Sequence, residues 1–309
     1  MEQNIYNKNL EVPSRKVDAV IDTDAFNEID DQFAISYLLA SKDKINLTAL
    51  YAAPFSGTKN VSDPKIGMEK SFAEIINILT LTRCEEYIDD TFKGSDKYLK
   101  DEKTPVISDA ARDLAQRAKN YSPENPLYVI TIGAITNIAS ALLIDPTIAE
   151  NIVIVWLGGH ALHFHDTKEF NMQQDVAAAR VVFMSDAPLV QLPCMGVVSQ
   201  FAIPGEELKY HIKGKNKLCD YLYDIVEECF ENSENMCNSR VIWDVTAVAW
   251  LLNDNDKFML SRVIDCPVPD YDYKYNGTIN KKIRYIYFIN RDVLATDLFK
   301  KIANEENFK

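Results

Sequence analysis

The chain has 309 residues, 47% of them hydrophobic, and a formal net charge of −13. This negative charge disfavours nucleic acid and anionic membranes as partners, because binding to phosphate groups requires clustered Lys and Arg. No apolar run reaches the roughly 20 residues of a membrane-spanning helix. The first residues are polar, and the six scattered cysteines contain no CxxC pair, which indicates reduced thiols. We therefore expect a cytoplasmic protein with neither a nucleic-acid nor a membrane partner.

The most informative segment lies near the start of the chain. An apolar strand predicted at residues 17–24 carries Asp22 and Asp24, and Asp30 and Asp31 follow where a helical pattern begins. Sites in α/β proteins lie at the carboxyl ends of parallel strands. The four acids could simply cap a turn and a helix, but carboxylates this close would repel one another if buried without a cation. We therefore predict a site for a hard metal ion, which takes oxygen ligands.

Strands and helices then alternate over about two thirds of the chain. We predict strands at residues 45–52, 127–132, 152–157, 189–192 and 283–288, and helices at 65–81, 106–119, 134–143, 175–184 and 292–303, with a helical and mixed stretch from residue 206. The continuous apolar runs indicate strands that are covered on both faces. We predict a single α/β domain over residues 1–309, with a mainly parallel, Rossmann-like sheet flanked by helices and a polar extension at residues 1–15.

Three further segments contain side chains that could carry chemistry. Trp243 and Asp244 stand on an apolar helical face, and Glu169 and Asn171 stand just before a helix. Each pair alone also fits an ordinary helix start or loop. Three histidines at positions 160, 163 and 165 follow Gly158-Gly159. Their spacing matches no standard zinc motif, so we favour a histidine that donates a hydrogen bond or a proton in a pocket loop.

Taken in order, these segments resemble the inosine–uridine-preferring nucleoside hydrolase family. The acids at 22, 24, 30 and 31 are similar to the family's opening motif of aspartates, and residues 130–139 (ITIGAITNIA) look like its middle block. A strand that ends in Gly-Gly, the block at 168–178 and the Trp243-Asp244 pair complete the match. The resemblance spans roughly residues 17–252 and implies the family's fold and N-glycosidic bond hydrolysis.

The resemblance also implies a role for each matching residue. The family's Ca²⁺ ligands would fall on Asp24, Asp31, Asp244 and the main-chain carbonyl of Ile132. Asp30 would hold the ribose hydroxyls, and Asp22 would be a structural acid of the motif. The following residues would contact the sugar or the base: Glu169, Asn171, His163 and Trp243.

The chain departs from the family pattern around the pocket. The loop at 25–29 has five residues where the family has three, and His163 stands where a sugar-binding Asn is expected. Trp243 replaces the His that can protonate the leaving base in many members, and a Trp there stacks on the base in a purine-specific branch. The resemblance therefore implies purine nucleosides as substrates, with Asp24 as general base. The second stacking aromatic would be Phe55, Tyr98 or Phe164. Alternatively, His163 or His165 could be the acid, which would favour a different base.

Two alternatives remain open at the level of sequence. One is a non-catalytic nucleoside or sugar sensor that keeps the fold and the metal. The other is a Mg²⁺-dependent phosphohydrolase, which the 10 glycines and the missing Gly-rich phosphate loop disfavour. By analogy with the family we expect a homodimer or homotetramer.

Overall fold

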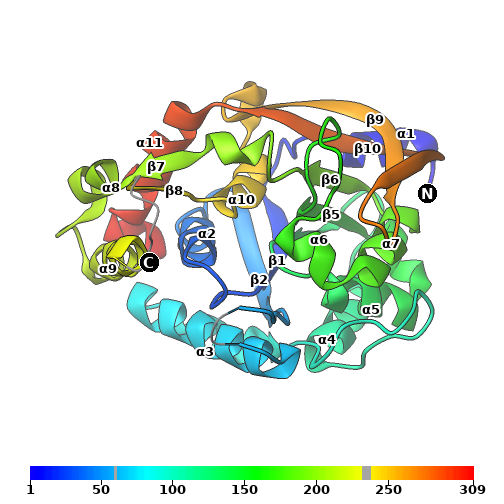
Figure 1. Ribbon diagram of the computed structural model, residues 1–309, viewed down its shortest axis with the longest axis horizontal. Helices are drawn as coiled ribbons and strands as arrows, with labels where there is room; N and C mark the ends of the chain where they lie inside the picture. Colours follow the sequence, from blue (N-terminus) through cyan, green and yellow to red (C-terminus); the bar gives the residue numbers. More distant parts are fainter. Residues whose placement is uncertain (59–60, 232–237) are drawn as a thin grey trace.

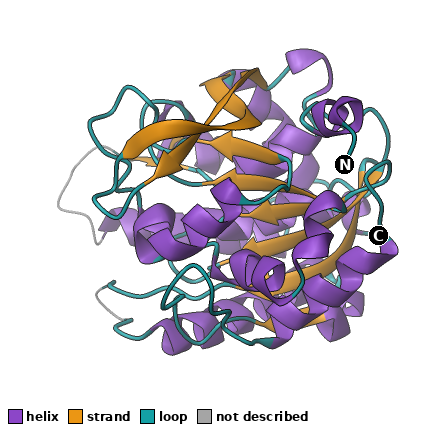
Figure 2. Cartoon of the chain, turned by 90° about the vertical axis from the view of Figure 1, so that its right-hand side faces the viewer, coloured by secondary structure: helices purple, strands orange, loops and turns teal. Residues whose placement is uncertain are grey.

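An eight-stranded sheet forms the centre of the protein, with helices on both of its faces (Figures 1 and 2). The computed structural model describes residues 1–58, 61–231 and 238–309. The strand order is β3-β2-β1-β4-β5-β6-β10-β9. All neighbours in this sheet pair in parallel except β10 and β9, which form an antiparallel hairpin at one edge. The predicted fold class is therefore confirmed.

The strands of the main sheet have the following bounds: β1 Val17–Thr23, β2 Ile45–Ala52, β3 Thr91–Lys93, β4 Leu127–Thr131, β5 Ile152–Leu157, β6 Leu189–Leu192, β9 Met259–Pro269 and β10 Tyr275–Ile289. A separate two-stranded sheet pairs β7 Ala202–Pro204 with β8 Ser239–Val241. The helices are α1 Gln3–Asn9, α2 Asp30–Leu39, α3 Pro64–Thr82, α4 Asp109–Arg117, α5 Thr136–Ile144, α6 Phe170–Gln174, α7 Val176–Met184, α8 Gly205–Ile212, α9 Lys217–Glu231, α10 Val245–Leu251 and α11 Arg291–Ile302.

The apolar strands supply side chains to a separate core on each face of the sheet. In β5, Val153 and Val155 join the core beneath α2, α10 and α11, whereas Ile154 and Trp156 join the core beneath α4, α5 and α7. Successive side chains of a strand point to opposite faces, so a strand buried on both faces needs an apolar residue at every position. This requirement explains the continuous apolar runs in the sequence.

The connections of the sheet determine where a ligand can bind. From β1 the chain continues through α2 and α3 toward one edge of the sheet, and from β4 it continues through α5 and α7 toward the other. The strand order therefore reverses between β1 and β4. In open α/β sheets the crevice at the carboxyl ends of such a strand pair is the usual ligand site. Here β1 and β4 are adjacent and parallel.

Several elements differ from the sequence prediction or were missed by it. The helix expected at 106–119 begins only at Asp109, because the Ser108 side chain caps it by accepting a hydrogen bond from the Ala111 N–H. The expected polar extension contains α1, and the Arg284 side chain donates a hydrogen bond to the Leu10 carbonyl directly after it. The long hairpin of β9 and β10 was expected only as the strand 283–288.

Two expectations from composition can be compared with the described residues. No helix among them is long and apolar enough to cross a membrane. The five cysteines that the structure describes are free, and Cys237 lies outside the described residues.

Candidate functional site

A cavity of about 220 Å³ opens at the carboxyl ends of β1, β4, β5 and β6. Its walls come from the loops that follow these strands and from the start of α10. The lining residues are Asp24, Asn27, Glu28, Asp30, Asp31, Ile132, Leu157, His160, Lys168, Glu169, Phe170, Asn171, Cys194, Met195, Trp243 and Asp244. The residues to which the resemblance assigned metal, sugar or base contacts are among them, apart from His163. The candidate second aromatics and His165 are not among them.

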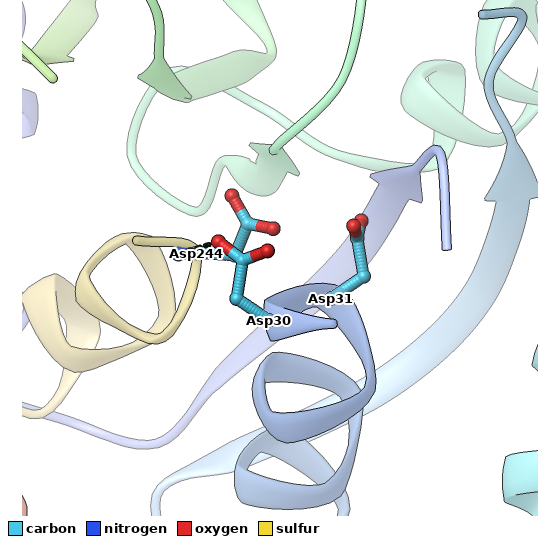
Figure 3. A group of neighbouring side chains, drawn as sticks. All are labelled: Asp30, Asp31 and Asp244. Carbon is cyan, nitrogen blue, oxygen red and sulfur yellow. Dashed lines mark hydrogen bonds between the residues drawn. The ribbon is translucent and has the colours of Figure 1, made fainter. Parts of the chain in front are cut away.

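Three aspartates lie close together in this cavity, although more than 200 residues separate Asp244 from the other two in the chain. Asp30 and Asp31 occupy the first turn of α2, and Asp244 immediately precedes α10 (Figure 3). One carboxylate oxygen from each lies within 4.8 Å of the others, and all three side chains are buried. The Asp244 N–H donates a hydrogen bond of 3.3 Å to the Asp30 Oδ2. This spacing and the all-oxygen donor set suit a hard divalent cation.

Asp24 faces the same cavity from the end of β1. Its side chain is 2% exposed, and its Oδ2 is buried without a hydrogen-bond partner among the described residues. A buried carboxylate oxygen without a partner is costly unless a ligand or a cation satisfies it. Gly133 leaves the necessary room, since a Cβ on this residue would lie 2.8 Å from the Asp24 Oδ1. These observations fit the predicted metal site, with Asp24 beside the three clustered acids.

Burial and mutual repulsion disfavour ionisation of these acids. Desolvation raises the pKa of Asp24 well above its ordinary value, and the charge of Asp31 adds to the effect. Asp30 and Asp244 have pKa values raised well above the ordinary value for the same principal reason. The pKa of Asp31 rises to about 7, also mainly through desolvation. A bound cation would favour the charged forms, so metal binding at neutral pH releases protons.

Glu169 and Asn171 are fixed by hydrogen bonds at the start of α6. The Glu169 carboxylate accepts hydrogen bonds from the N–H groups of Gly159, Asn171 and Met172, at 2.9, 2.9 and 3.0 Å. The Asn171 side-chain amide donates to the main-chain carbonyls of Ile132 at 3.0 Å and Leu157 at 3.1 Å. These bonds connect α6 to the ends of β4 and β5. They also orient the Ile132 carbonyl, which keeps a second lone pair for another ligand.

Asp22 lies behind the cavity wall and does not line the cavity. It accepts hydrogen bonds from the Asn137 amide at 2.7 Å and from the Thr131 hydroxyl at 3.3 Å. Burial raises the pKa of Asp22 to about 7. Asn137 also accepts hydrogen bonds from Ser95, so Asp22 contributes to a buried network that connects β1, β4, α5 and the segment after β3. This arrangement agrees with the structural role expected from the resemblance.

Trp243 lines the cavity beside Asp244, whereas the expected partner aromatics lie elsewhere. Phe55 is fully buried in the core, and the Tyr98 hydroxyl contacts Gln174, away from the cavity lining. Phe164 is 36% exposed and packs against the histidines of its own loop. The aromatic side chain that does line the cavity together with Trp243 is Phe170, the first residue of α6.

The three histidines have different environments. His165 is largely exposed and lies 2.7 Å from Asp166. His163 is exposed and does not line the cavity, so its predicted role in binding or catalysis stays a prediction without a contact that supports it. His160 does line the cavity and is half-buried. His163 and His165 are the candidate acids named from the sequence, which stays a prediction, whereas the histidine that lines the cavity is His160.

Sequence reasoning also missed several residues of the cavity. Cys194 and Met195 follow β6, and the strand-end rule that identified Asp24 could have found them. Glu28 lines the cavity from the five-residue loop after Asp24, and its carboxylate is 2.6 Å from the Arg240 guanidinium of β8. No local pattern in the sequence connects Glu28 with Arg240, since this pair forms only through the tertiary fold.

The sequence profile of the inosine-uridine preferring nucleoside hydrolases matches residues 19–282. The chain belongs to this family. The resemblance found in the sequence is therefore confirmed, and the protein is an N-glycosidase of a metal-dependent family whose substrates are nucleosides. The probable uridine nucleosidase 2 of Arabidopsis thaliana is 26% identical to this nucleoside hydrolase over 231 residues, which cover 69% of each chain.

Solved structures share the fold. A purine-preferring ribonucleoside hydrolase from Gardnerella vaginalis matches with a TM-score of 0.72 at 19% identity, covering 94% of this chain and 100% of its own. The plant nucleoside hydrolase PpNRh1 also has a TM-score of 0.72, at 18% identity, with 93% of this chain and 99% of its own covered. The type III effector XopQ, solved with adenosine diphosphate ribose, matches with a TM-score of 0.68 at 14% identity, covering 99% of this chain and 98% of its own.

Proposed function

We propose that this protein is a Ca²⁺-dependent ribonucleoside hydrolase that releases ribose and prefers purine bases. The observation that supports it best is the buried group of Asp30, Asp31 and Asp244 in the cavity, with the unpartnered Oδ2 of Asp24 beside it. The ion would be held by Asp24, Asp31, Asp244 and the carbonyl of Ile132. When bound, it would acidify a water and orient the ribose hydroxyls.

The residues of the chain supply the remaining parts of the reaction. Asp24 accepts the proton of the attacking water, whose oxygen forms a bond to C1′ of the ribose. The bond between C1′ and the base nitrogen breaks, its electron pair leaves with the base, and the base takes up a proton from solvent. The sugar passes through a state resembling an oxocarbenium ion, which the nearby carboxylates stabilise. Asp30, Glu169 and Asn171 hold the ribose hydroxyls, and their buried positions limit the access of other water molecules.

Trp243 supports the purine preference. It lines the cavity and is half-buried, so its ring is accessible to a planar base. Stacking on an aromatic face favours the larger π-system of a purine. The relatives carry names of both kinds, a uridine nucleosidase and a purine-preferring hydrolase. The preference therefore rests on Trp243, with Phe170 as the second aromatic side chain of the cavity.

The test is release of reducing sugar from inosine, adenosine, guanosine, uridine and cytidine, with Ca²⁺ and with chelator. We expect chelator-sensitive release that is fastest with the purines. Asp24→Asn should reduce turnover by more than about a hundred-fold, because it removes the general base. Asp22→Asn is the matched control, since it changes a buried aspartate two residues away that does not line the cavity.

Each alternative gives a distinct result. Equal release of ribose from pyrimidine nucleosides would contradict the purine preference but not the hydrolase activity. Restoration of activity by Mg²⁺ but not by Ca²⁺ would show that the enzyme uses Mg²⁺ in place of Ca²⁺. Thermal stabilisation by nucleosides without any product would indicate a sensor. We further propose a cytoplasmic homodimer or homotetramer, and sedimentation of the purified protein measures the assembly.

A further inference from the structure

The cavity has a buried floor and a partly exposed rim. The floor contains the acids at 24, 30, 31 and 244 together with Glu169 and Asn171. The rim contains side chains that are half-buried or exposed, namely Asn27, Glu28, His160, Lys168, Phe170, Met195 and Trp243. A nucleoside whose ribose hydroxyls meet the floor, as the proposed function requires, places its base at the rim.

His160 stands out among the polar side chains of the rim because one of its ring nitrogens has no partner. Its Nδ1 is buried and makes no hydrogen bond with any described residue. Two cavity-lining side chains have such an atom within the described part of the chain, and the other is Asp24. Glu28 pairs with Arg240, and the Lys168 ammonium lies 5.3 Å from the centre of the Tyr273 ring. A buried polar atom without a partner costs free energy unless a ligand satisfies it.

The backbone around His160 fixes the ring at the cavity wall. The main-chain N–H of His160 donates a hydrogen bond of 3.2 Å to the Thr167 hydroxyl. The next residue, Ala161, donates its N–H to the Met195 carbonyl at 3.0 Å, which joins the loops after β5 and β6. The ring itself packs at 5.5 Å from the Phe164 ring. The imidazole is therefore held in place before any substrate binds.

We propose that His160 donates a hydrogen bond to the base of the bound nucleoside and stabilises it as it leaves. This inference rests on the proposed function. The bond between C1′ and the base nitrogen breaks, and the electron pair goes to the base. The imidazole N–H of His160 donates a hydrogen bond to the developing negative charge on the base until solvent protonates the base. Burial lowers the pKa of His160, with the charge of Asp166 opposing the change, so the ring is largely neutral near pH 7. A neutral imidazole still carries one N–H donor.

A residue that assists the leaving group matters only when the leaving group is poor. We therefore compare inosine with p-nitrophenyl β-D-ribofuranoside, whose nitrophenolate leaves without assistance. His160→Phe keeps the packing against Phe164 and removes both nitrogens. We expect its kcat for inosine to fall by about ten- to a hundred-fold, with little change in kcat for the nitrophenyl riboside. His160→Asn restores an N–H donor near the Nδ1 position and should recover part of the loss.

The controls separate this inference from the proposed function. His211→Phe makes the same substitution in α8, at a histidine that does not line the cavity, and should leave the hydrolysis of both substrates unaffected. If His160→Phe lowers kcat equally for both substrates, or for neither, the inference is wrong. The proposed hydrolase function is unaffected by that result. If the wild-type protein hydrolyses neither substrate in the presence of Ca²⁺, the proposed function fails and the inference falls with it. Thermal unfolding of each variant shows whether a loss comes from misfolding.

Discussion

Replacing Asp31 by Asn should stabilise the metal-free protein and abolish its response to Ca²⁺. The Asp31 Oδ1 accepts a hydrogen bond of 2.5 Å from the Thr23 hydroxyl, and an Asn side-chain oxygen can accept the same bond. The substitution therefore removes the charge and keeps the contact. The charge is unfavourable without a cation, because desolvation raises the pKa of Asp31 to about 7. The same charge is required when a cation binds.

The magnitude follows from the shift in pKa. A rise from 3.8 to about 7 corresponds to roughly 4 kcal/mol at about 1.4 kcal/mol per unit. When folding raises the pKa of a carboxyl group, the free energy of unfolding decreases as the pH rises from the unfolded-state pKa through the folded-state pKa. The advantage of Asp31→Asn over the wild type should thus be small near pH 4 and reach about 4 kcal/mol above pH 7. At about 2 °C per kcal/mol for a chain of this size, the Tm rises by about 8 °C.

Thermal unfolding in chelator and in Ca²⁺, at pH 5.5 and pH 8, measures both effects. Asp89→Asn is the control, since it removes one negative charge from an exposed position on the surface. A variant of Asp31 that is less stable than the wild type in chelator at pH 8 would refute the electrostatic argument. A variant that Ca²⁺ stabilises as strongly as the wild type would exclude Asp31 from the ligand set.

Two further predictions concern residues that support the site. Gly133→Ala should weaken Ca²⁺ binding by about ten- to a hundred-fold, because its Cβ would lie 2.8 Å from the Asp24 Oδ1. Calorimetric titration measures this, and an unchanged Kd would contradict it. Asp22→Ala should be less stable than Asp22→Asn by about 1–3 kcal/mol, because only Asn can still accept the hydrogen bond from Asn137. Equal urea midpoints for the two variants would show that this bond contributes nothing.

Local pattern was enough to predict most of the parallel sheet. The strands at 45–52, 152–157 and 189–192 have the bounds predicted for them, because a strand buried on both faces needs an apolar residue at every position. Helix starts were less certain, as α4 shows, since a helix begins where a side chain such as Ser108 can cap it. The hairpin of β9 and β10 was predicted poorly. Its exposed half alternates polar and apolar residues irregularly, which gives no clear periodicity.

The sequence by itself determined the family, the parallel sheet and the chemistry of the acids around Asp24. These features depend on residue types at short spacing, which local structure converts directly into strand ends and helix starts. The family resemblance had already grouped Asp244 with Asp24 and Asp31. Only the tertiary structure decided that Glu28 pairs with Arg240 and which of three neighbouring histidines lines the cavity. Such contacts depend on how segments distant in the chain pack together, and no short-range pattern carries that information.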